Sequence, residues 1–193
     1  MRENRTTQAR LDPRRPLVLD TRELGRRPGS MLPMHRQVPA PAALGVEPIG
    51  VSEGSLLELD IQLESVVEGV FVSGTARARA TGECVRCLIP IELDVSAPLD
   101  ELFAYPGSTS EQTAEDDEVR PIEGDYIDLE PTVRDAVVLA LPLMPLCKDD
   151  CQGLCATCGE RIEDLPADHT HETLDPRWAA LTERFSGKQD DPK

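Results

Sequence analysis

Residues 57–79 have the sequence LELDIQLESVVEGVFVSGTARAR, and this stretch decides what kind of fold the chain can take. Over residues 57–64 every second position is aliphatic and the positions between are polar, which is typical of a strand with one buried face. A second alternating run occupies residues 70–79. Glu68-Gly69 lies between the runs and predicts a two-residue hairpin turn. The stretch therefore predicts two adjacent antiparallel strands.

The predicted turn also sets the register of this hairpin, because each residue then has one partner on the opposite strand. Acidic side chains of the first strand would face arginines of the second, and aliphatic side chains would face alanines. The predicted pairs are Asp60 with Arg77, Glu58 with Arg79, Ile61 with Ala76 and Leu59 with Ala78. Each pair is chemically matched, which supports the pairing of the two strands.

Three shorter segments also predict strands. Residues 89–95 alternate again and should return antiparallel to the second strand of the hairpin. Residues 17–19 and 126–127 predict two short strands elsewhere in the chain.

A helix is predicted to follow the last of these strands. Asp128 or Glu130 can cap its N-terminus, Pro131 lies in its first turn and Pro142 ends it. Its apolar stripe consists of Val133, Val137, Ala140 and Leu141. A second, short helix is predicted over residues 176–185.

The chain has 193 residues, of which 39 % are hydrophobic and 3 % aromatic, enough for one modest and mainly aliphatic core. We expect one domain over residues 16–185, between a disordered Arg-rich leader (1–15) and a disordered tail (186–193). Within the domain, residues 106–124 predict a flexible acidic loop, and residues 147–160 form a cysteine-rich segment.

Neither an export signal nor a membrane span is predicted. Arg14-Arg15 is not followed by the apolar region that an export signal needs. The longest apolar run, residues 136–147, contains two prolines and is shorter than the about 20 residues needed to cross a bilayer. We therefore expect a soluble cytoplasmic protein without membrane contact.

The net charge of −16 is divided unevenly along the chain. Residues 1–36 contain nine arginines and four acidic residues, whereas residues 37–193 contain 11 basic and 32 acidic residues. An acidic body repels a phosphate backbone, so any contact with nucleic acid must come from the N-terminal arm or from a local basic patch. A solvated acidic surface that maintains solubility is an equally good explanation of the charge.

Six cysteines in a reducing cytoplasm are more often metal ligands or free thiols than disulfides. Cys84 and Cys87 form a C-x-x-C motif in the predicted turn between the second and third strands, which supplies half of a tetrahedral zinc site. Cys155 and Cys158 form a second C-x-x-C followed by Gly159, and we expect them to complete a four-thiolate site.

Cys147 and Cys151 are the alternative ligands, four residues apart in the same segment. They could replace one of the pairs, bind a second ion, or be spare thiols. With either ligand set, the sequence predicts an α+β fold: mainly antiparallel β-sheet or a partly open barrel, with a helix packed on it and a zinc knuckle in the C-terminal segment.

A catalytic role is not predicted. The C-x-x-C pairs would also suit thiol exchange, but neither pair opens a helix in a βαβ unit, where such thiols have a lowered pKa. His169 and His171 could be ligands or a base, but in an acidic polar loop they are more often surface residues. Four thiolates would leave zinc no open position for a substrate. We therefore expect neither an enzyme nor a small-molecule substrate.

Four segments together resemble the large ribosomal RNA subunit accumulation protein family, YceD-like. They are PLVLDTRELGR (16–26), GECVRCL (82–88), DLEPTVRDAVVLALP (128–142) and PLCKDDCQGLCATCG (145–159). The resemblance covers roughly residues 16–160 and is closest to the branch of the family in Gram-positive bacteria and actinobacteria. Cys84 and Cys87 match the central C-x-x-C of the family, whereas the later cysteines match only part of it.

This resemblance implies a cytosolic, non-enzymatic factor for the accumulation of large-subunit ribosomal RNA. Its partner would be that RNA, a ribosomal protein or an assembly intermediate. The arginines that could contact phosphate are Arg86, Arg77, Arg79, Arg22, Arg26 and Arg27, and Arg86 is the best single candidate. The competing hypotheses are a zinc-containing adaptor that docks a basic protein on its acidic surface and, less favoured, a thiol redox protein.

Overall fold

The computed structural model describes residues 11–113 and 119–171, and its chain divides into two compact units at Cys151–Gln152. The elements of the first unit are β1 (Val18–Asp20), β2 (Met31–Pro39), β3 (Leu44–Val46), β4 (Ile49–Val51), β5 (Leu56–Ser65), β6 (Gly69–Glu83), β7 (Pro90–Ala104), α1 (Thr109–Thr113), β8 (Arg120–Pro121), β9 (Tyr126–Asp128) and α2 (Glu130–Ala140). The second unit contains one short 3-10 turn, Ile162–Asp164.

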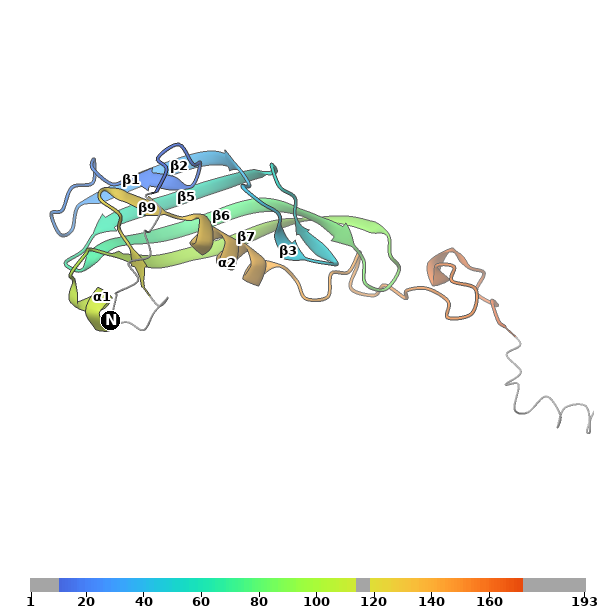
Figure 1. Ribbon diagram of the computed structural model, residues 1–193. Helices are drawn as coiled ribbons and strands as arrows, with labels where there is room; N and C mark the ends of the chain where they lie inside the picture. Colours follow the sequence, from blue (N-terminus) through green and yellow to red (C-terminus); the bar gives the residue numbers. More distant parts are fainter. Residues whose placement is uncertain (1–10, 114–118, 172–193) are drawn as a thin grey trace, which may run out of the picture. The chain divides into compact units, whose positions relative to one another are not determined.

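Seven strands form the main sheet (Figure 1). Its strands lie in the order β2-β5-β6-β7-β8, and β4 pairs with β6 beyond the end of β5, with β3 outside it. Every pairing is antiparallel except that of β7 with β8. The strands β2 and β8 do not pair with each other among the described residues, so the sheet is open rather than closed into a barrel.

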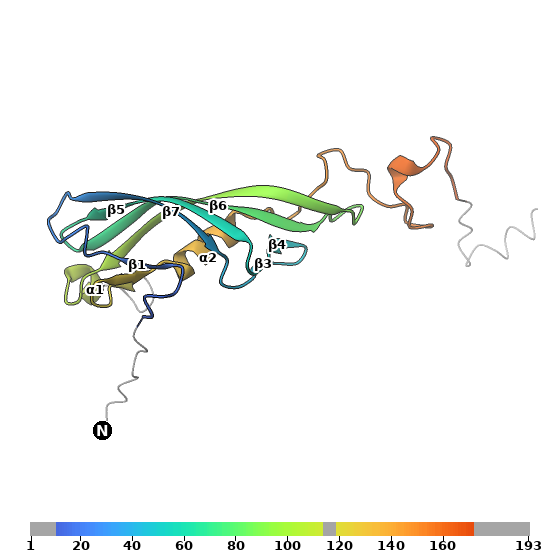
Figure 2. The same cartoon turned by 90° about the horizontal axis from the view of Figure 1, so that it is seen from above.

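One face of this sheet carries the hydrophobic core. The alternation seen in the sequence puts the aliphatic residues of β5, β6 and β7 on that face, where they are buried. A second layer covers them, made of α2 and the two-stranded sheet of β1 and β9 (Figure 2). Among the described residues, no second layer lies on the opposite face of β5, β6 and β7, which carries their polar side chains and which we call the uncovered face.

The register of the β5–β6 hairpin differs from the predicted one by two residues. The backbone groups of Val66 and Gly69 bond to each other, so the turn is Val67-Glu68 rather than Glu68-Gly69. The observed pairs are Glu58 with Arg77, Leu59 with Ala76, Leu57 with Ala78 and Asp60 with Thr75. A shift of two residues leaves every side chain on its predicted face, because the strand period is two.

The role of Gly69 explains why the sequence predicts the hairpin turn at Glu68-Gly69 rather than at Val67-Glu68. A Cβ on Gly69 would lie 1.9 Å from the carbonyl oxygen of Phe103, which pairs near it on β7. This glycine is therefore required by the close approach of two strands and not by the turn.

The strand after the cysteine turn is longer than predicted. Residues 89–95 were expected, whereas β7 continues to Ala104. Pro98 is atypical of a strand interior, but among the described residues the outer edge of β7 pairs only with β8, at Phe103 and Ala104. A proline is accepted in such an edge strand, and Ala97 and Leu99 beside it still point into the core.

Helix α2 agrees with the predicted helix and lies against β7, β6 and β3. The carboxylate of Asp128 accepts a hydrogen bond from the N–H of Glu130 at 2.9 Å, although Leu129 is the N-cap residue. Val133 and Val137 are buried as expected, whereas Ala140 at the end of the helix is exposed. Leu141, just after the helix, is half-buried and packs against the core, so only Ala140 departs from the predicted stripe.

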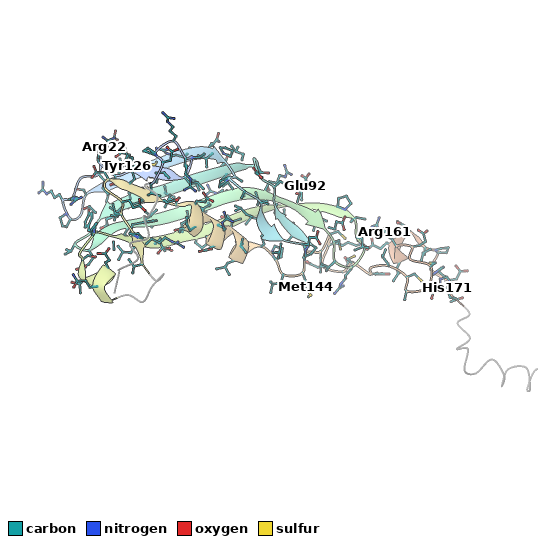
Figure 3. The ribbon with its side chains drawn as sticks, viewed as in Figure 1. Arg22, Glu92, Tyr126, Met144, Arg161 and His171 are labelled. Carbon is teal, nitrogen blue, oxygen red and sulfur yellow. The ribbon has the colours of Figure 1, made fainter. Side chains whose placement is uncertain are left out.

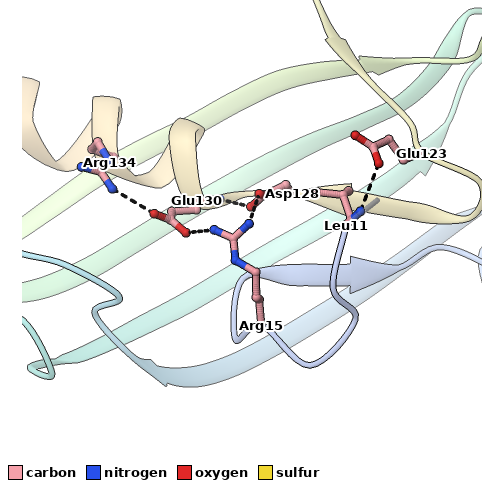
Figure 4. A network of polar contacts seen from close by, with 6 residues as sticks. All are labelled: Leu11, Arg15, Glu123, Asp128, Glu130 and Arg134. Carbon is pink, nitrogen blue, oxygen red and sulfur yellow. Dashed lines mark hydrogen bonds and ion pairs between the residues drawn. The ribbon is translucent and has the colours of Figure 1, made fainter. Parts of the chain in front are cut away.

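Residues 11–15, which composition assigns to the leader, contact the domain (Figure 4). The N–H of Leu11 donates to Glu123 at 3.1 Å. The guanidinium of Arg15 bonds to Asp128 at 3.0 Å and also to Glu130. These bonds attach the start of the described chain to the strand and helix that cover the core.

Three other predictions of the sequence concern residues outside the described ranges. They are residues 114–118 of the predicted acidic loop (106–124), the helix at 176–185 and the tail at 186–193; the described parts of the predicted loop contain α1 and β8. Across the described residues, no helix is both long and apolar enough to span a membrane.

The buried face of β5 should determine stability. Leu59 is 0 % exposed, and Leu59→Ala should lower the free energy of unfolding by about 2–5 kcal/mol, because the truncation leaves a cavity in the core. Asp60→Ala, one residue away on the exposed face, should change it by less than about 0.5 kcal/mol. Urea denaturation monitored by circular dichroism measures both changes; equal midpoints for the two variants would contradict the assignment of the faces.

Candidate metal centre

The connection from β6 to β7 is a tight turn that begins with Cys84. Its N–H donates to the carbonyl of Ile89 at 2.9 Å, and the N–H of Leu88 donates back to the carbonyl of Cys84 at 2.9 Å. Leu88 adopts a positive φ of 59°, a conformation that costs a non-glycine residue about 1 kcal/mol or more. Within this turn the side chains of Cys84 and Cys87 are buried.

The segment that follows α2 docks on this turn. The N–H of Val85 donates to the carbonyl of Pro145 at 3.0 Å, and the guanidinium of Arg86 donates to the carbonyl of Cys151 at 2.8 Å. A second turn in the segment is closed by the N–H of Cys151, which donates to the carbonyl of Lys148 at 3.1 Å. These bonds bring the segment's two cysteines, 147 and 151, next to those of the β6–β7 turn.

Cys84, Cys87, Cys147 and Cys151 together form what we call the four-cysteine cluster. Its four sulfur atoms all lie within 4.8 Å of one another. The sulfur atoms of Cys84 and Cys151 are 3.8 Å apart, and those of Cys87 and Cys147 are 3.6 Å apart. Tetrahedral zinc with Zn–S bonds of about 2.3 Å requires sulfur–sulfur distances of about 3.8 Å. The cluster therefore has the dimensions of a zinc–tetrathiolate site.

The electrostatics of the cluster also favour a cation. Burial raises the pKa of the Cys84 thiol, but N–H groups of Cys147, Cys87 and Arg86 donate to its sulfur and bring the pKa down to about 6. Burial and the neighbouring thiols of Cys87, Cys151 and Cys84 raise the pKa of Cys147 to about 12. Four crowded thiols thus cannot all ionise by themselves, whereas a bound divalent cation would stabilise all four thiolates.

This grouping differs from the pairing we expected from the sequence. Cys84 and Cys87 lie with Cys147 and Cys151, which the sequence offered only as alternative ligands. Cys155 and Cys158, the expected partners, belong to a second group with His169 and His171 in the other compact unit. We call this group the Cys-His cluster. Among the described residues, these are the two groups of side chains whose spacing suits a metal ion.

Comparison with known proteins identifies the family. Residues 72–183, more than half of the chain, match the family described as large ribosomal RNA subunit accumulation protein YceD. The chain belongs to this family. The matched region of this YceD-family chain includes all the residues of both clusters.

The chain also resembles several bacterial proteins along most of its length. It is 47 % identical over 175 residues to an uncharacterized protein of Mycobacterium tuberculosis, covering 91 % of this chain and 84 % of that one. An uncharacterized protein of Mycobacterium leprae is 43 % identical over 171 residues, with coverages of 89 % and 78 %. A more distant relative, the uncharacterized protein YlbN of Bacillus subtilis, is 28 % identical over 109 residues, with coverages of 56 % and 60 %. No solved structure gives a significant match.

Two of the arginines expected to contact RNA have partners within the YceD-family domain. Arg86 bonds to the carbonyl of Cys151 and so helps to hold the four-cysteine cluster together. The guanidinium of Arg79 is 3.0 Å from the carboxylate of Glu92, which is labelled in Figure 3. The partner of Arg79 is therefore an acid on β7, and not Glu58 on β5 as the predicted register required.

Two arginines near β1 lie beside aromatic rings. The guanidinium of Arg22 is 2.9 Å from the carboxylate of Asp20 and 6.0 Å from the ring centre of Tyr126 (Figure 3). That of Arg26 is 5.1 Å from the ring centre of Tyr105. Both distances are within the range of cation–π contacts.

The remaining two arginines lie in different surroundings. Arg27 is exposed in the loop before β2, and its carbonyl accepts a bond from the N–H of Ser30. Arg77 is on the uncovered face of the sheet, between Glu58 on β5 and Ser96 on β7. It lines a groove of about 570 Å³ whose other lining residues are Leu56, Glu58, Ala78, Arg79, Asp94, Val95 and Ser96.

Sequence analysis missed the contact that joins the two halves of the four-cysteine cluster, the bond from Val85 to Pro145. The usable signal was position: Cys147 follows the end of α2, a helix that packs on β7, by seven residues, and β7 starts three residues after Cys87. The spacing of Cys147 and Cys151, with three residues between them, still permits both sulfurs to approach one point.

Loss of the metal should release the segment around residues 145–151. A structural zinc contributes on the order of 10 kcal/mol to folding stability. Without it, the thiolates would repel one another or take up protons. Cys147→Ser, or treatment with a strong chelator, should therefore speed amide hydrogen exchange at Val85 and Cys151, while β5 remains protected. Hydrogen-exchange mass spectrometry measures both regions.

The matched control for this experiment is Cys158→Ser. It removes a thiol from the Cys-His cluster, so exchange at Val85 and Cys151 should remain as in the unmodified chain. Faster exchange there in Cys158→Ser would instead favour the mixed ligand set that we expected from the sequence.

Proposed function

We propose that this protein is a non-enzymatic factor that supports the accumulation of large-subunit ribosomal RNA, with zinc in the four-cysteine cluster as a structural element. The observation that carries this proposal is the match of residues 72–183 to the YceD family, whose description names that role. The match begins in β6 and continues through the cluster. The family relationship and the metal-binding geometry therefore concern the same part of the chain.

The ligand set supports a structural rather than a catalytic metal. Four thiolates fill the tetrahedral coordination of zinc, and a catalytic zinc needs a position open to water or substrate. Three of the four cysteines are buried: Cys84, Cys87 and Cys151. The proposed zinc would tie the segment after α2 to the β6–β7 turn, and thereby hold the exposed residues of that turn, such as Val85 and Leu88, in one arrangement.

Direct contact with ribosomal RNA would use the arginines named above, of which Arg77 is the most informative. Arg86 and Arg79 are engaged with Cys151 and Glu92, so part of their charge is already compensated. Arg77 lies in the groove on the uncovered face, and six residues of β6 separate it from Cys84, the cluster's nearest cysteine in sequence. A charge reversal at Arg77 therefore tests RNA contact without removing a metal ligand.

A second mode of action is favoured by the acidic residues of the uncovered face. That face carries Glu58, Asp60 and Glu64 from β5 and Glu92, Asp94 and Asp100 from β7, the two strands that flank β6. A surface of this charge attracts a basic partner and repels phosphate. Ribosomal proteins are basic, so the domain could act as an adaptor that docks one of them during assembly of the large subunit.

The experiment compares the two modes in mycobacterial cells in which this chain replaces its 47 % identical relative. Ultraviolet crosslinking followed by RNA sequencing should recover a defined large-subunit site, and Arg77→Glu should weaken that signal several-fold. The double variant Asp60→Lys/Asp100→Lys should leave the crosslink intact. The ratio of large-subunit to small-subunit RNA should fall with loss of the protein and with Cys84→Ser.

The adaptor mode gives the opposite pattern. A basic ribosomal protein would copurify with the chain, Asp60→Lys/Asp100→Lys would abolish the copurification, and no RNA would crosslink above background. An unchanged ratio of the two ribosomal RNAs after removal of the protein would overturn the proposed function in both modes.

A further inference from the structure

The Cys-His cluster lies entirely within residues 155–171 of the second compact unit. Its four ligand atoms, two sulfurs and two imidazole nitrogens, are all within 4.8 Å of one another. We propose that Cys155, Cys158, His169 and His171 bind a second zinc ion, independently of the four-cysteine cluster.

The first argument is that the turn at Cys155 repeats the turn at Cys84. The N–H of Cys155 donates to the carbonyl of Glu160, five residues on, at 2.7 Å, and the N–H of Gly159 donates to the carbonyl of Cys155 at 2.9 Å. Cys84 makes the same two bonds with the residues five and four positions after it. The fifth residue of each turn has a positive φ: 75° at Gly159 and 59° at Leu88.

This repetition has a chemical consequence. In both turns the first and fourth residues are cysteines, and the backbone folds so that both sulfurs point to one side, as zinc knuckles require. The turn is thus suited to a thiolate pair.

The second argument concerns the histidines. His169 and His171 are two residues apart, so in an extended segment both side chains fall on the same side of the chain. A preceding turn, closed by the N–H of His169 and the carbonyl of Pro166 at 3.0 Å, directs them toward the cysteines. His171 is labelled in Figure 3.

The distances within the cluster fit zinc. The sulfur of Cys158 is 3.7 Å from Nε2 of His169, and tetrahedral zinc with bonds of about 2.3 Å to sulfur and about 2.0–2.1 Å to nitrogen places these atoms about 3.6 Å apart. The two imidazole rings are perpendicular, with centres 4.4 Å apart, so they do not stack against each other. Two thiolates with two imidazoles is a ligand set typical of structural zinc.

The third argument is that the described part of the second unit, residues 152–171, buries few side chains of its own. Gly153 is their one buried residue, and Leu154 and Leu165 are only half-buried. Segments without a core of their own fold on a metal or a disulfide, and no disulfide is present among the six cysteines. A metal bound at the Cys-His cluster would add to the backbone bonds and to the ion pairs of Arg161 that hold the turn at 155–160 and the bridge between Leu154 and Arg161.

The exposure of the two clusters predicts different rates of metal release. Cys158 and His171 are exposed, whereas three ligands of the four-cysteine cluster are buried. A chelator reaches exposed ligands first, so zinc should leave the Cys-His cluster sooner.

Native mass spectrometry of the full chain tests the proposal by counting zinc ions. The unmodified chain should carry two, and the double variant His169→Ala/His171→Ala should carry one. Thr170→Ala, a change between the two histidines that removes no ligand, should leave two. Cys147→Ser should lose the other ion and retain the one in the Cys-His cluster.

Cobalt substitution identifies the ligands directly. After Co²⁺ replaces zinc, Cys147→Ser should show the weaker thiolate charge-transfer absorption of two sulfurs, and His169→Ala/His171→Ala the stronger absorption of four. One zinc in the unmodified chain, or two zincs that persist in the histidine double variant, would overturn the proposal. Because none of these measurements involves ribosomal RNA, their outcome is separate from that of the proposed function.

Discussion

The long antiparallel pairing of β6 with β7 is the constraint on which the rest of the structure depends. Each strand has 15 residues, and they pair along their whole length from Gly69 with Ala104 to Glu83 with Pro90. The inner face of this ribbon supplies the centre of the core, and its end supplies the turn with Cys84 and Cys87 (Figure 1). Because β6 has no internal break, the position of the cysteine turn is set by the packing of the core.

Helix α2 gives the core and the metal site a second connection. It covers the sheet through Val133 and Val137, and the chain that leaves it reaches the cysteine turn within a few residues. The bond from Val85 to Pro145 is the first contact on this path. Cys147 and Cys151 therefore meet the turn as a consequence of how α2 packs, and the sulfur–sulfur distances of 3.6 and 3.8 Å follow from the fold.

The parts of this arrangement that depend on local pattern could be predicted from the sequence. Alternation located β5 and β6 and the faces of both strands, and Pro131 with Pro142 bounded the helix. What could not be predicted depends on contacts between distant segments. Gly69 resembles a turn residue until the approach of Phe103 is known, and Pro98 resembles a strand end although β7 continues past it.

The cysteine pairing illustrates the same limit at the site. Spacing favoured Cys155 and Cys158 as partners of Cys84 and Cys87, because two C-x-x-C motifs form a familiar ligand set. The spacing of the cysteines in the sequence does not indicate which segment the packing of α2 places beside the β6–β7 turn.

Ion pairs inside the domain determine which charge the protein presents to a partner. Arg15 and Arg22, in the arginine-rich arm, bond to Asp128, Glu130 and Asp20. Part of the positive charge of the arm is therefore neutralised by acidic residues of the domain. A similar ion pair, between Arg79 and Glu92, lies on the uncovered face. The acidic residues of the chain outnumber the basic ones by 16. Even if every basic side chain were paired with an acidic one, an excess of unpaired acidic side chains would therefore be left. A partner that approaches the domain from a distance thus encounters a negative potential, so direct RNA binding, as proposed above, would require a few close contacts rather than the field of the whole protein.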